Sequence, residues 1–377
     1  MKKLLQRLLK VVAYTAAGVV ILLAIAVGLF RLFLPRLPEY QEDIKGWASA
    51  AIGMNVEFSG MDARWGLSGP EVEFYDAELS SRETMARIVA ADEVSVGVGL
   101  MRLLVDRKLV VDRVIVRETS LELRQLENGE WWVQGIAPDQ LIPARRPDSE
   151  GIGQLEIIGE DIQIQFLQPG DERPRVFEVP RFTVSRDNVR IAVDAAVELP
   201  DDLGGSMSVT ATQIVAEGDA RPGWDVGVEI DDIELAGISA LHSAETASFR
   251  SGAGDVELSM AYADGEVTTA SANVDLRDIA LEGQAAFSLA GLIEFRNDVD
   301  GWLVAASRLQ FETLRGAWPE ASARVEAGTD SDGKIVMLDM SASYLNLTDV
   351  EVLMPWLPTA QKDLLASYAP DGVIRDF

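Results

Sequence analysis

The stretch Val256-Glu257-Leu258-Ser259-Met260-Ala261-Tyr262 decides the fold class of this chain. Large apolar side chains stand at every second position, with small or charged ones between them. A period of two is typical of a β-strand with one buried side and one solvent-facing side. The stretch therefore predicts a strand whose apolar side is formed by Val256, Leu258, Met260 and Tyr262.

The same alternation recurs on both sides of this stretch. Val226, Val228 and Ile230 form a second apolar set, and further sets lie at 162–166, 191–197 and 336–340. Asp-Gly pairs, which favour tight hairpins, separate the later sets. In the set near residue 300 we take the apolar positions as Leu303, Ala305, Leu309 and Phe311. With the sets before residue 151, the pattern predicts about 15–18 strands in one long, twisted antiparallel sheet and a few short helices. From the pattern alone, an ordinary half-buried sheet is the more common source of such apolar stripes.

The N-terminal part begins with a helical pattern over residues 39–52. Its expected apolar face holds Tyr40, Ile44, Trp47, Ala48 and Ala51. Strands are expected at 110–116 and 121–126, followed by a hairpin at Asn128-Gly129. Prolines and arginines over 137–150 predict a linker. The expected domains are 1–38, 39–136 and 151–377, with the linker between the last two.

Residues 11–30 contain no charged side chain. At 1.5 Å per residue they would span roughly 30 Å, the thickness of the bilayer hydrocarbon. We expect this segment to be a membrane anchor, with Val11, Val20, Leu22, Leu23 and Phe30 among its apolar residues. Bulky and basic residues follow it instead of a signal-peptidase site, which favours an uncleaved anchor. Small residues spaced four apart in this segment could pack against a partner helix in the membrane, although chance spacing is the better explanation in a segment so rich in alanine.

Basic residues precede the apolar segment, and they set its expected orientation. The side chains concerned are Lys2, Lys3, Arg7 and Lys10. Since basic flanks stay in the cytoplasm, we expect a single-pass membrane protein with its N-terminus inside and its bulk outside the membrane.

The charge distribution excludes a nucleic-acid partner. Formal net charge is −28. Six of the 33 basic residues and none of the 61 acidic ones lie in the first 36 positions, so the remainder carries 27 basic and 61 acidic residues, or −34. So acidic a surface repels nucleic acid and anionic headgroups.

The sequence carries no strong catalytic or cofactor motif. There is no cysteine, and His242 is the single histidine, so thiol chemistry and a histidine-based metal site are excluded. Phosphate-binding loops, a nucleophile elbow and a zinc-protease motif are also missing. We therefore expect no enzyme activity, no cofactor and no metal site. An envelope enzyme using paired carboxylates stays as an alternative, because acidic residues are abundant.

Several segments, taken in order, resemble the N-terminus of the AsmA-like proteins and in particular the YhdP family. After the basic start and the apolar segment come Leu34-Pro35-Arg36-Leu37, Gly53-Met54-Asn55-Val56, Trp65-Gly66 and Pro70-Glu71-Val72-Glu73-Phe74. Val94-Ser95-Val96, Leu103-Leu104 and Asn128-Gly129-Glu130-Trp131 follow. Residues 151–377 resemble the central YhdP region, including Trp356-Leu357-Pro358. Members of the family are much longer, so the chain resembles the N-terminal portion of such a protein.

This resemblance implies a bridge-like lipid carrier that is anchored in the inner membrane, with its N-terminus in the cytoplasm and its bulk in the periplasm. Its open hydrophobic β-groove is expected to move phospholipids between the inner and outer membranes and to support the outer-membrane permeability barrier. The expected groove lining is Val226, Val228, Ile230, Val256, Leu258, Met260 and Tyr262. The alternative partner class is unfolded outer-membrane proteins, which a periplasmic assembly factor would bind through exposed strand edges.

Overall fold

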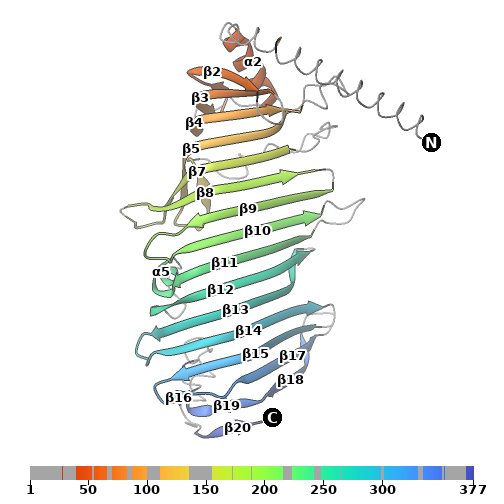
Figure 1. Ribbon diagram of the computed structural model, residues 1–377. Coiled ribbons are helices and arrows are strands. Elements are labelled where there is room, and N and C mark those ends of the chain that lie inside the picture. Colours follow the sequence, from red (N-terminus) through yellow and green to blue (C-terminus); the bar gives the residue numbers. More distant parts are fainter. Residues whose placement is uncertain are drawn as a thin grey trace, which may run out of the picture. The chain divides into compact units, whose positions relative to one another are not determined.

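The computed structural model describes residues 28, 40–52, 55–65, 70–82, 87–99, 111–135, 155–171, 173–187, 189–214, 223–241, 248–263, 265–298, 301–329, 334–349, 352 and 371–377. Within these ranges the chain is mainly β, with twenty strands (Figure 1). Strands β1 to β18 form one open, mostly antiparallel sheet, and β19 pairs with β20. The predicted mainly β class is therefore confirmed.

The chain divides into two compact units, which we describe one at a time. Unit 1 comprises Met1–Leu121 and Trp132–Ile157, and unit 2 comprises Glu122–Trp131 and Ile158–Phe377.

Unit 1 contains helix α2 and an antiparallel sheet. Helix α2 (Gln41–Ile52) is followed by β1 (Asn55–Glu57), β2 (Gly60–Trp65), β3 (Pro70–Ser80), β4 (Arg87–Val98) and β5 (Val111–Gln125), whose last residues belong to unit 2. One side is apolar as predicted, because Phe74 lies opposite Val94, and Val94 lies opposite Val116.

The other side of the unit 1 sheet carries ion pairs. Arg64 contacts Glu71 at 3.0 Å and Glu73 at 2.6 Å, and Arg117 pairs with Glu93. The hydrogen bond to Glu71 is the main reason why the pKa of Arg64 is raised above its usual value. This side therefore carries paired charges, with Tyr75 and Ile115 among them.

Unit 2 is a meander in which each strand pairs with the next. Its strands are β7 (Leu155–Leu167), which begins in unit 1, β8 (Arg175–Arg186), β9 (Arg190–Glu198), β10 (Ser206–Ile214), β11 (Trp224–Glu234), β12 (Phe249–Ala263), β13 (Glu266–Leu281), β14 (Phe287–Asp298), β15 (Gly301–Thr313), β16 (Gly316–Ala317), β17 (Ala321–Thr329) and β18 (Ile335–Ala342). The pairings from β8 to β18 are antiparallel, with β15 pairing to both β16 and β17. Helix α5 (Leu235–Ala240) follows β11, and the short pair β19 (Tyr344–Asn346) and β20 (Val373–Arg375) follows β18.

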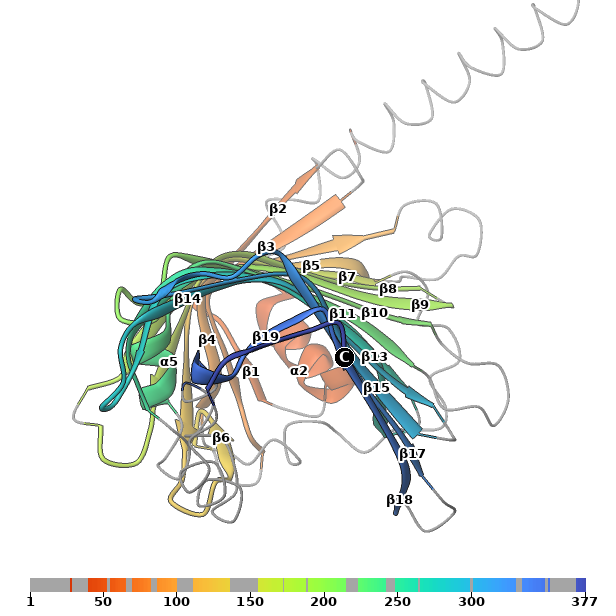
Figure 2. The ribbon, with the colours of Figure 1, turned by 90° about the horizontal axis from the view of Figure 1, so that it is seen from below.

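Three bulges bend the sheet of unit 2. They lie on alternate strands, at Asp232 in β11, Asp278 in β13 and Arg308 in β15, each with φ of 52°. An extra residue in one strand bends the strand and increases its twist. Gly254 lies in β12 between the first two bulges, where an added Cβ would stand 1.9 Å from the carbonyl oxygen of Asp275. The three bulges lie at similar positions along their strands, and together they account for the arched section of unit 2 in Figure 2.

The bulge at Arg308 corrects one prediction from the sequence. Leu303 and Ala305 lie opposite Arg296 and Glu294, on the polar side of the sheet, whereas Phe311 lies opposite Leu289 on the apolar side. The bulge adds one residue, so the alternation changes phase and the four predicted positions do not share a side.

Unit 1 differs from the prediction in two further details. The predicted strands 110–116 and 121–126 are one strand, β5, which stays continuous through Glu118 with φ of 50°. Tyr40, placed on the apolar face of the first helix, is 54% exposed. The Asn128-Gly129 turn is present, with Gly129 at φ 83° and its N–H donating to the Leu126 carbonyl oxygen at 2.9 Å.

Several predicted segments lie outside the described residues. They include the linker 137–150, His242, the segment around Trp356, and the anchor 11–30 except for Gly28. None of the helices in the described ranges is both long enough and apolar enough to cross a bilayer.

Candidate functional site

One side of the unit 2 sheet is apolar over ten strands, and we call it the apolar face. It follows directly from the pairing register, since residues opposite each other in an antiparallel pair point to the same side. Its central members are Phe182, Val184, Val193, Ala195, Val197, Met207, Val209, Ala211, Val226, Val228, Ile230, Val256, Leu258, Met260, Ala270, Ala272, Val274, Ile293, Phe295, Val304, Ala306, Ala323, Val325, Leu338 and Met340.

The structure brings the predicted lining residues together on this face. Val226 lies opposite Met260, and Val228 lies opposite Leu258. Ile230 lies opposite Val256 in the same register. Tyr262, the seventh predicted position, lies opposite Trp224. The two sets predicted on separate strands therefore form one surface on adjacent strands.

Sequence reasoning missed most of the surface. The same alternation is visible in residues 207–211, 270–274 and 302–306, but small alanines and hydroxyl residues weaken it there. The pairing register shows that these weaker stretches belong to the same side of the sheet, because Leu258 is opposite Ala272 and Ala272 is opposite Ile293.

The middle of the apolar face is half-buried. From Phe182 in β8 to Val325 in β17, every central member has intermediate exposure, and none belongs to the buried core. Neighbours in the same sheet shelter the sides of these residues, but a second layer would bury them almost fully. We find no such layer over this region among the described residues.

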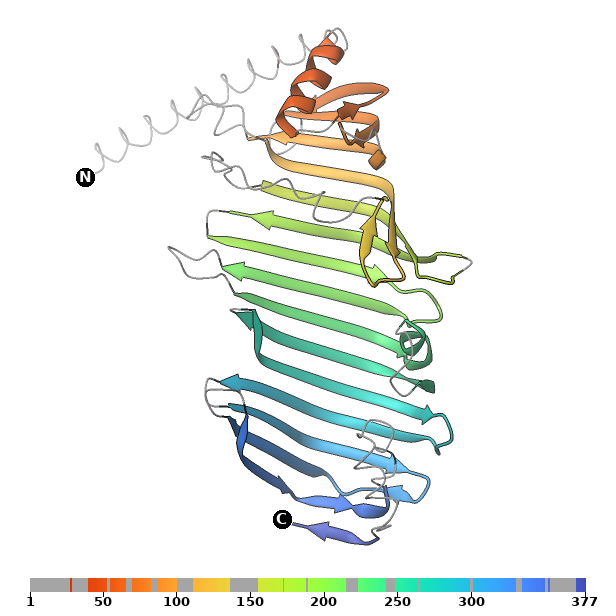
Figure 3. The same cartoon turned by 180° about the vertical axis from the view of Figure 1, so that it is seen from behind.

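One end of the apolar face is closed by helix α5. Leu235 of α5 packs with Ile233, Ile279, Leu281 and Phe287. All five side chains are between 1% and 9% exposed. Ile230 and Val256 pack against the edge of this cluster. Two of the predicted lining residues therefore belong to the border of a closed core, which we call the sealed end. Figure 3 shows helix α5, in green, beside the ends of the strands in this part of unit 2.

Helix α5 is held by the turn between β9 and β10. The Glu234 N–H donates to the Leu203 carbonyl oxygen at 2.8 Å, and Leu203 is 1% exposed. A Cβ on Gly237 would lie 1.6 Å from the Asp202 carbonyl oxygen. The helix can approach this turn so closely because residue 237 has no side chain.

The opposite end of the apolar face carries three aromatic side chains. Trp224 begins β11, Tyr262 lies near the end of β12, and Trp302 lies at the start of β15. The register places all three on the apolar face, since Val304, two residues after Trp302, lies opposite Phe295. Tyr262 is 41% exposed, and the two indoles are half-buried. We call this border the aromatic rim.

The reverse side of the sheet is polar. Glu257, Ser259 and Glu294 are exposed there. A shallow depression of about 610 Å³ lies over Gly227, Ser259 and Ser271, where small side chains leave the sheet surface low. Hydroxyl and charged groups such as Thr210, Asp225 and Arg296 alternate with apolar groups in its lining, so an acyl chain there would also cover polar groups.

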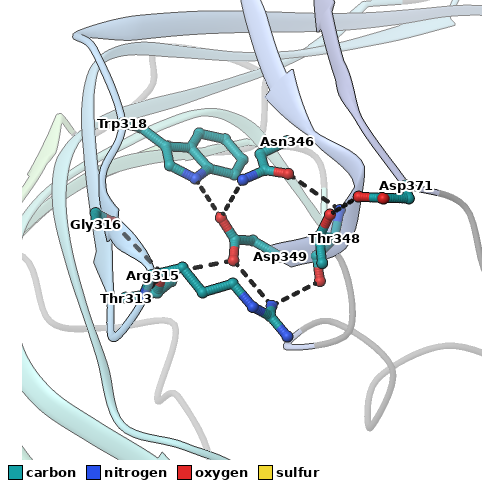
Figure 4. Close-up of polar contacts among 8 residues, drawn as sticks. All are labelled: Thr313, Arg315, Gly316, Trp318, Asn346, Thr348, Asp349 and Asp371. Carbon is teal, nitrogen blue, oxygen red and sulfur yellow. Dashed lines mark hydrogen bonds and ion pairs between the residues drawn. The ribbon is translucent and has the colours of Figure 1, made fainter.

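A buried carboxylate connects the last strands of unit 2. Asp349 is 3% exposed and accepts hydrogen bonds from Trp318 Nε1 and Asn346 Nδ2, both at 2.8 Å (Figure 4). Arg315 Nη1 donates to it at 3.2 Å, and Thr313 Oγ1 at 3.5 Å. Both carboxylate oxygens are thus occupied by donors, which suits a structural role.

Acidic clusters in the described part of the chain do not form a metal site. No group of three or more histidine or carboxylate side chains there is arranged to hold an ion.

Comparison with known proteins places this architecture in a family. A family model described as "YhdP protein" matches residues 1–377. The "Intermembrane phospholipid transporter YhdP" of Escherichia coli (strain K12) is 26% identical over 234 residues, which cover 61% of this chain and 18% of that protein. The chain thus matches less than a fifth of that relative's length. Since the family model covers the whole chain, the protein belongs to the YhdP family.

Proposed function

We propose that the apolar face of unit 2 carries the acyl chains of phospholipids moving between the inner and outer membranes. The observation that carries this proposal is the apolar surface that continues over ten strands, half-buried from β8 to β17, without a described second layer. The sequence similarity between this chain and an intermembrane phospholipid transporter supports phospholipid as the cargo.

The surface suits sliding better than tight binding. Acyl chains are attracted by apolar area, at about 25 cal/mol per Å² covered, without directional bonds. Successive strands offer similar apolar rows, so a lipid moving from one strand to the next exchanges one apolar contact for another. Such a surface acts as an open groove and needs no catalytic group.

Leu258→Asp tests this proposal at the centre of the face. Leu258 is half-buried and lies outside the sealed cluster, so the new carboxylate can keep part of its hydration. We expect near-normal protein abundance and loss of phospholipid crosslinking from photoreactive residues farther along the face. Ser259→Asp introduces the same charge on the polar side and should leave crosslinking intact.

Two results would contradict the conduit. One is collapse of the Leu258→Asp protein with no lipid adduct from any apolar-face position of the wild type, which indicates an ordinary packed sheet. The other is equal loss of lipid crosslinking in the Leu258→Asp and Ser259→Asp proteins.

The proposal places the protein in the inner membrane, anchored by residues 11–30. Lys2, Lys3, Arg7 and Lys10 keep the N-terminus in the cytoplasm, and the sheet works in the periplasm. Asp201, in the exposed turn after β9, is a suitable fusion point for a reporter. A reporter fused there that is active only in the cytoplasm would refute this topology.

Strand β18 gives a reason to keep the second candidate function, binding of unfolded outer-membrane proteins. Ile335, Val336, Met337 and Leu338 are between 51% and 67% exposed. Among the described strands, only β17 pairs with this stretch. An exposed apolar edge can pair with another chain. Binding of unfolded porins by the delipidated protein, abolished by a proline at Leu338, would favour this function.

A further inference from the structure

We infer that the phospholipid lies parallel to the strands with a fixed polarity, its headgroup at the aromatic rim and its acyl ends toward the sealed end. This inference rests on the proposed function and adds the orientation of the cargo. It follows from the difference between the two ends of the apolar face, from the distance between them and from the chemistry of the rim.

The distance between the two ends matches one layer of lipid. Tyr262 at the rim and Val256 at the sealed cluster are six residues apart on β12, or roughly 20 Å at 3.3 Å per residue. Half of a bilayer's hydrocarbon core is roughly 15 Å thick. The part of the apolar face between Tyr262 and Val256 therefore accommodates the acyl chains of one phospholipid, from the ester group to the terminal methyl group.

The buried cluster at the sealed end offers no place for a headgroup. Ile279, Leu281 and Phe287 are buried there beneath α5. A phosphate brought among these side chains would lose its water and meet no donor of the cluster itself, which is costly. Donors at its border, Gln284 and Arg315, line a separate cavity of about 430 Å³ beside Phe287. A terminal methyl group, in contrast, loses nothing at an apolar wall.

The rim offers groups that suit the boundary between acyl chain and headgroup. Trp and Tyr combine an apolar ring with one hydrogen-bond donor and gather at membrane–water interfaces for that reason. Neither the Tyr262 hydroxyl nor the indole N–H of Trp224 or Trp302 donates to another described residue, so these donors can serve ester or phosphate oxygens.

Single-cysteine labelling tests the orientation directly, because the chain has no cysteine of its own. A fluorophore is attached to full-length Tyr262→Cys, Leu258→Cys or Ser259→Cys protein. Each is titrated with phosphatidylcholine that carries a nitroxide quencher on the headgroup, near the ester or near the terminal methyl. Trp224→Cys repeats the rim position on the neighbouring strand if Tyr262→Cys is poorly folded.

The expected result is a reversal of the quenching order between two positions on one strand. At 262 the headgroup nitroxide quenches most, and at 258 the terminal-methyl nitroxide quenches most. The label at 259, on the polar side, is quenched little by any of the three. Identical or inverted orders at 262 and 258 would overturn the orientation while leaving lipid binding in place. No quenching above the level at 259 would overturn the proposed function itself.

A second measurement tests the donors. Trp302→Phe keeps an apolar ring but removes the N–H, so we expect about five-fold weaker phospholipid binding and unchanged binding of an alkane probe without a headgroup. Trp131→Phe is the matched control, since Trp131 stacks on Phe166 at 5.4 Å, away from the rim. Equal weakening in the Trp302 and Trp131 variants would contradict a role for the rim donor.

Discussion

The two ends of the apolar face differ although the same strands build them. At the sealed end, Leu281 is 1% exposed and lies in a packed cluster under α5. At the aromatic rim, Tyr262 on the adjacent β12 is 41% exposed. Both residues continue an apolar alternation, so alternation alone does not decide whether an apolar side becomes core or open surface. The connection between β11 and β12 decides it, by placing a helix over one end.

The largest expected effect comes from placing the same charge at each end. Leu281→Asp buries an unpaired carboxylate and should cost more than about 4 kcal/mol of unfolding free energy. Met260→Asp, on the half-buried part of the face, should cost about 1–2 kcal/mol. Chemical denaturation of the two proteins checks this, with Leu314→Asp, at an 83% exposed leucine, as the neutral control. Equal costs at 281 and 260 would mean that the face is packed along its whole length.

Gly237→Ala tests the close contact between α5 and the turn that joins β9 to β10. The added methyl would overlap the Asp202 carbonyl oxygen, so we expect a loss of roughly 2–3 kcal/mol and increased hydrogen exchange at Leu235. The control is Gly46→Ala in α2, where a Cβ meets no atom within 4 Å. That change should stabilise the helix by roughly 0.5–1 kcal/mol. Unchanged exchange at Leu235 in the Gly237 variant would show that α5 does not depend on this close approach.

Asp349→Ala tests whether the buried carboxylate supports the sealed end. Val352, three residues on, packs against the buried cluster. Loss of the carboxylate leaves Trp318 Nε1 without its acceptor, and we expect a cost of about 2–3 kcal/mol. Thermal unfolding measures it, with the exposed Asp371→Ala expected within about 0.5 kcal/mol of wild type. A similar melting temperature for both variants would remove Asp349 from this role.

The smallest expected effect is at the rim. Tyr262→Phe removes a hydroxyl without a described protein partner and should change the unfolding free energy by less than about 0.5 kcal/mol. Urea denaturation followed by circular dichroism checks this. A loss above 1 kcal/mol would indicate that the hydroxyl has a structural partner, and the rim would then resemble the sealed end more closely.

Only the two central strands of the candidate site were predicted from local pattern. The sets around Val228 and Leu258 were recognised because strong β-formers alternate there with polar residues. The four positions from Leu303 to Phe311 were wrongly assigned to one side, since the bulge at Arg308 has no distinctive sequence signal and changes the phase of the strand. The aromatic rim was missed because Trp224 and Trp302 stand at strand ends, far apart in the chain, and only the register places them on one side.

The sequence by itself determined the mainly β class, the alternation that makes one side of each strand apolar, and the Asn128-Gly129 turn, because these depend on neighbouring residues. Only the tertiary structure decided which strands pair, where bulges shift the phase, and where the apolar face is sealed or open. Those properties depend on contacts between distant residues, such as Gly237 with Asp202 and Leu235 with Leu281. A residue's own neighbours in sequence carry no record of whether a helix will later cover it.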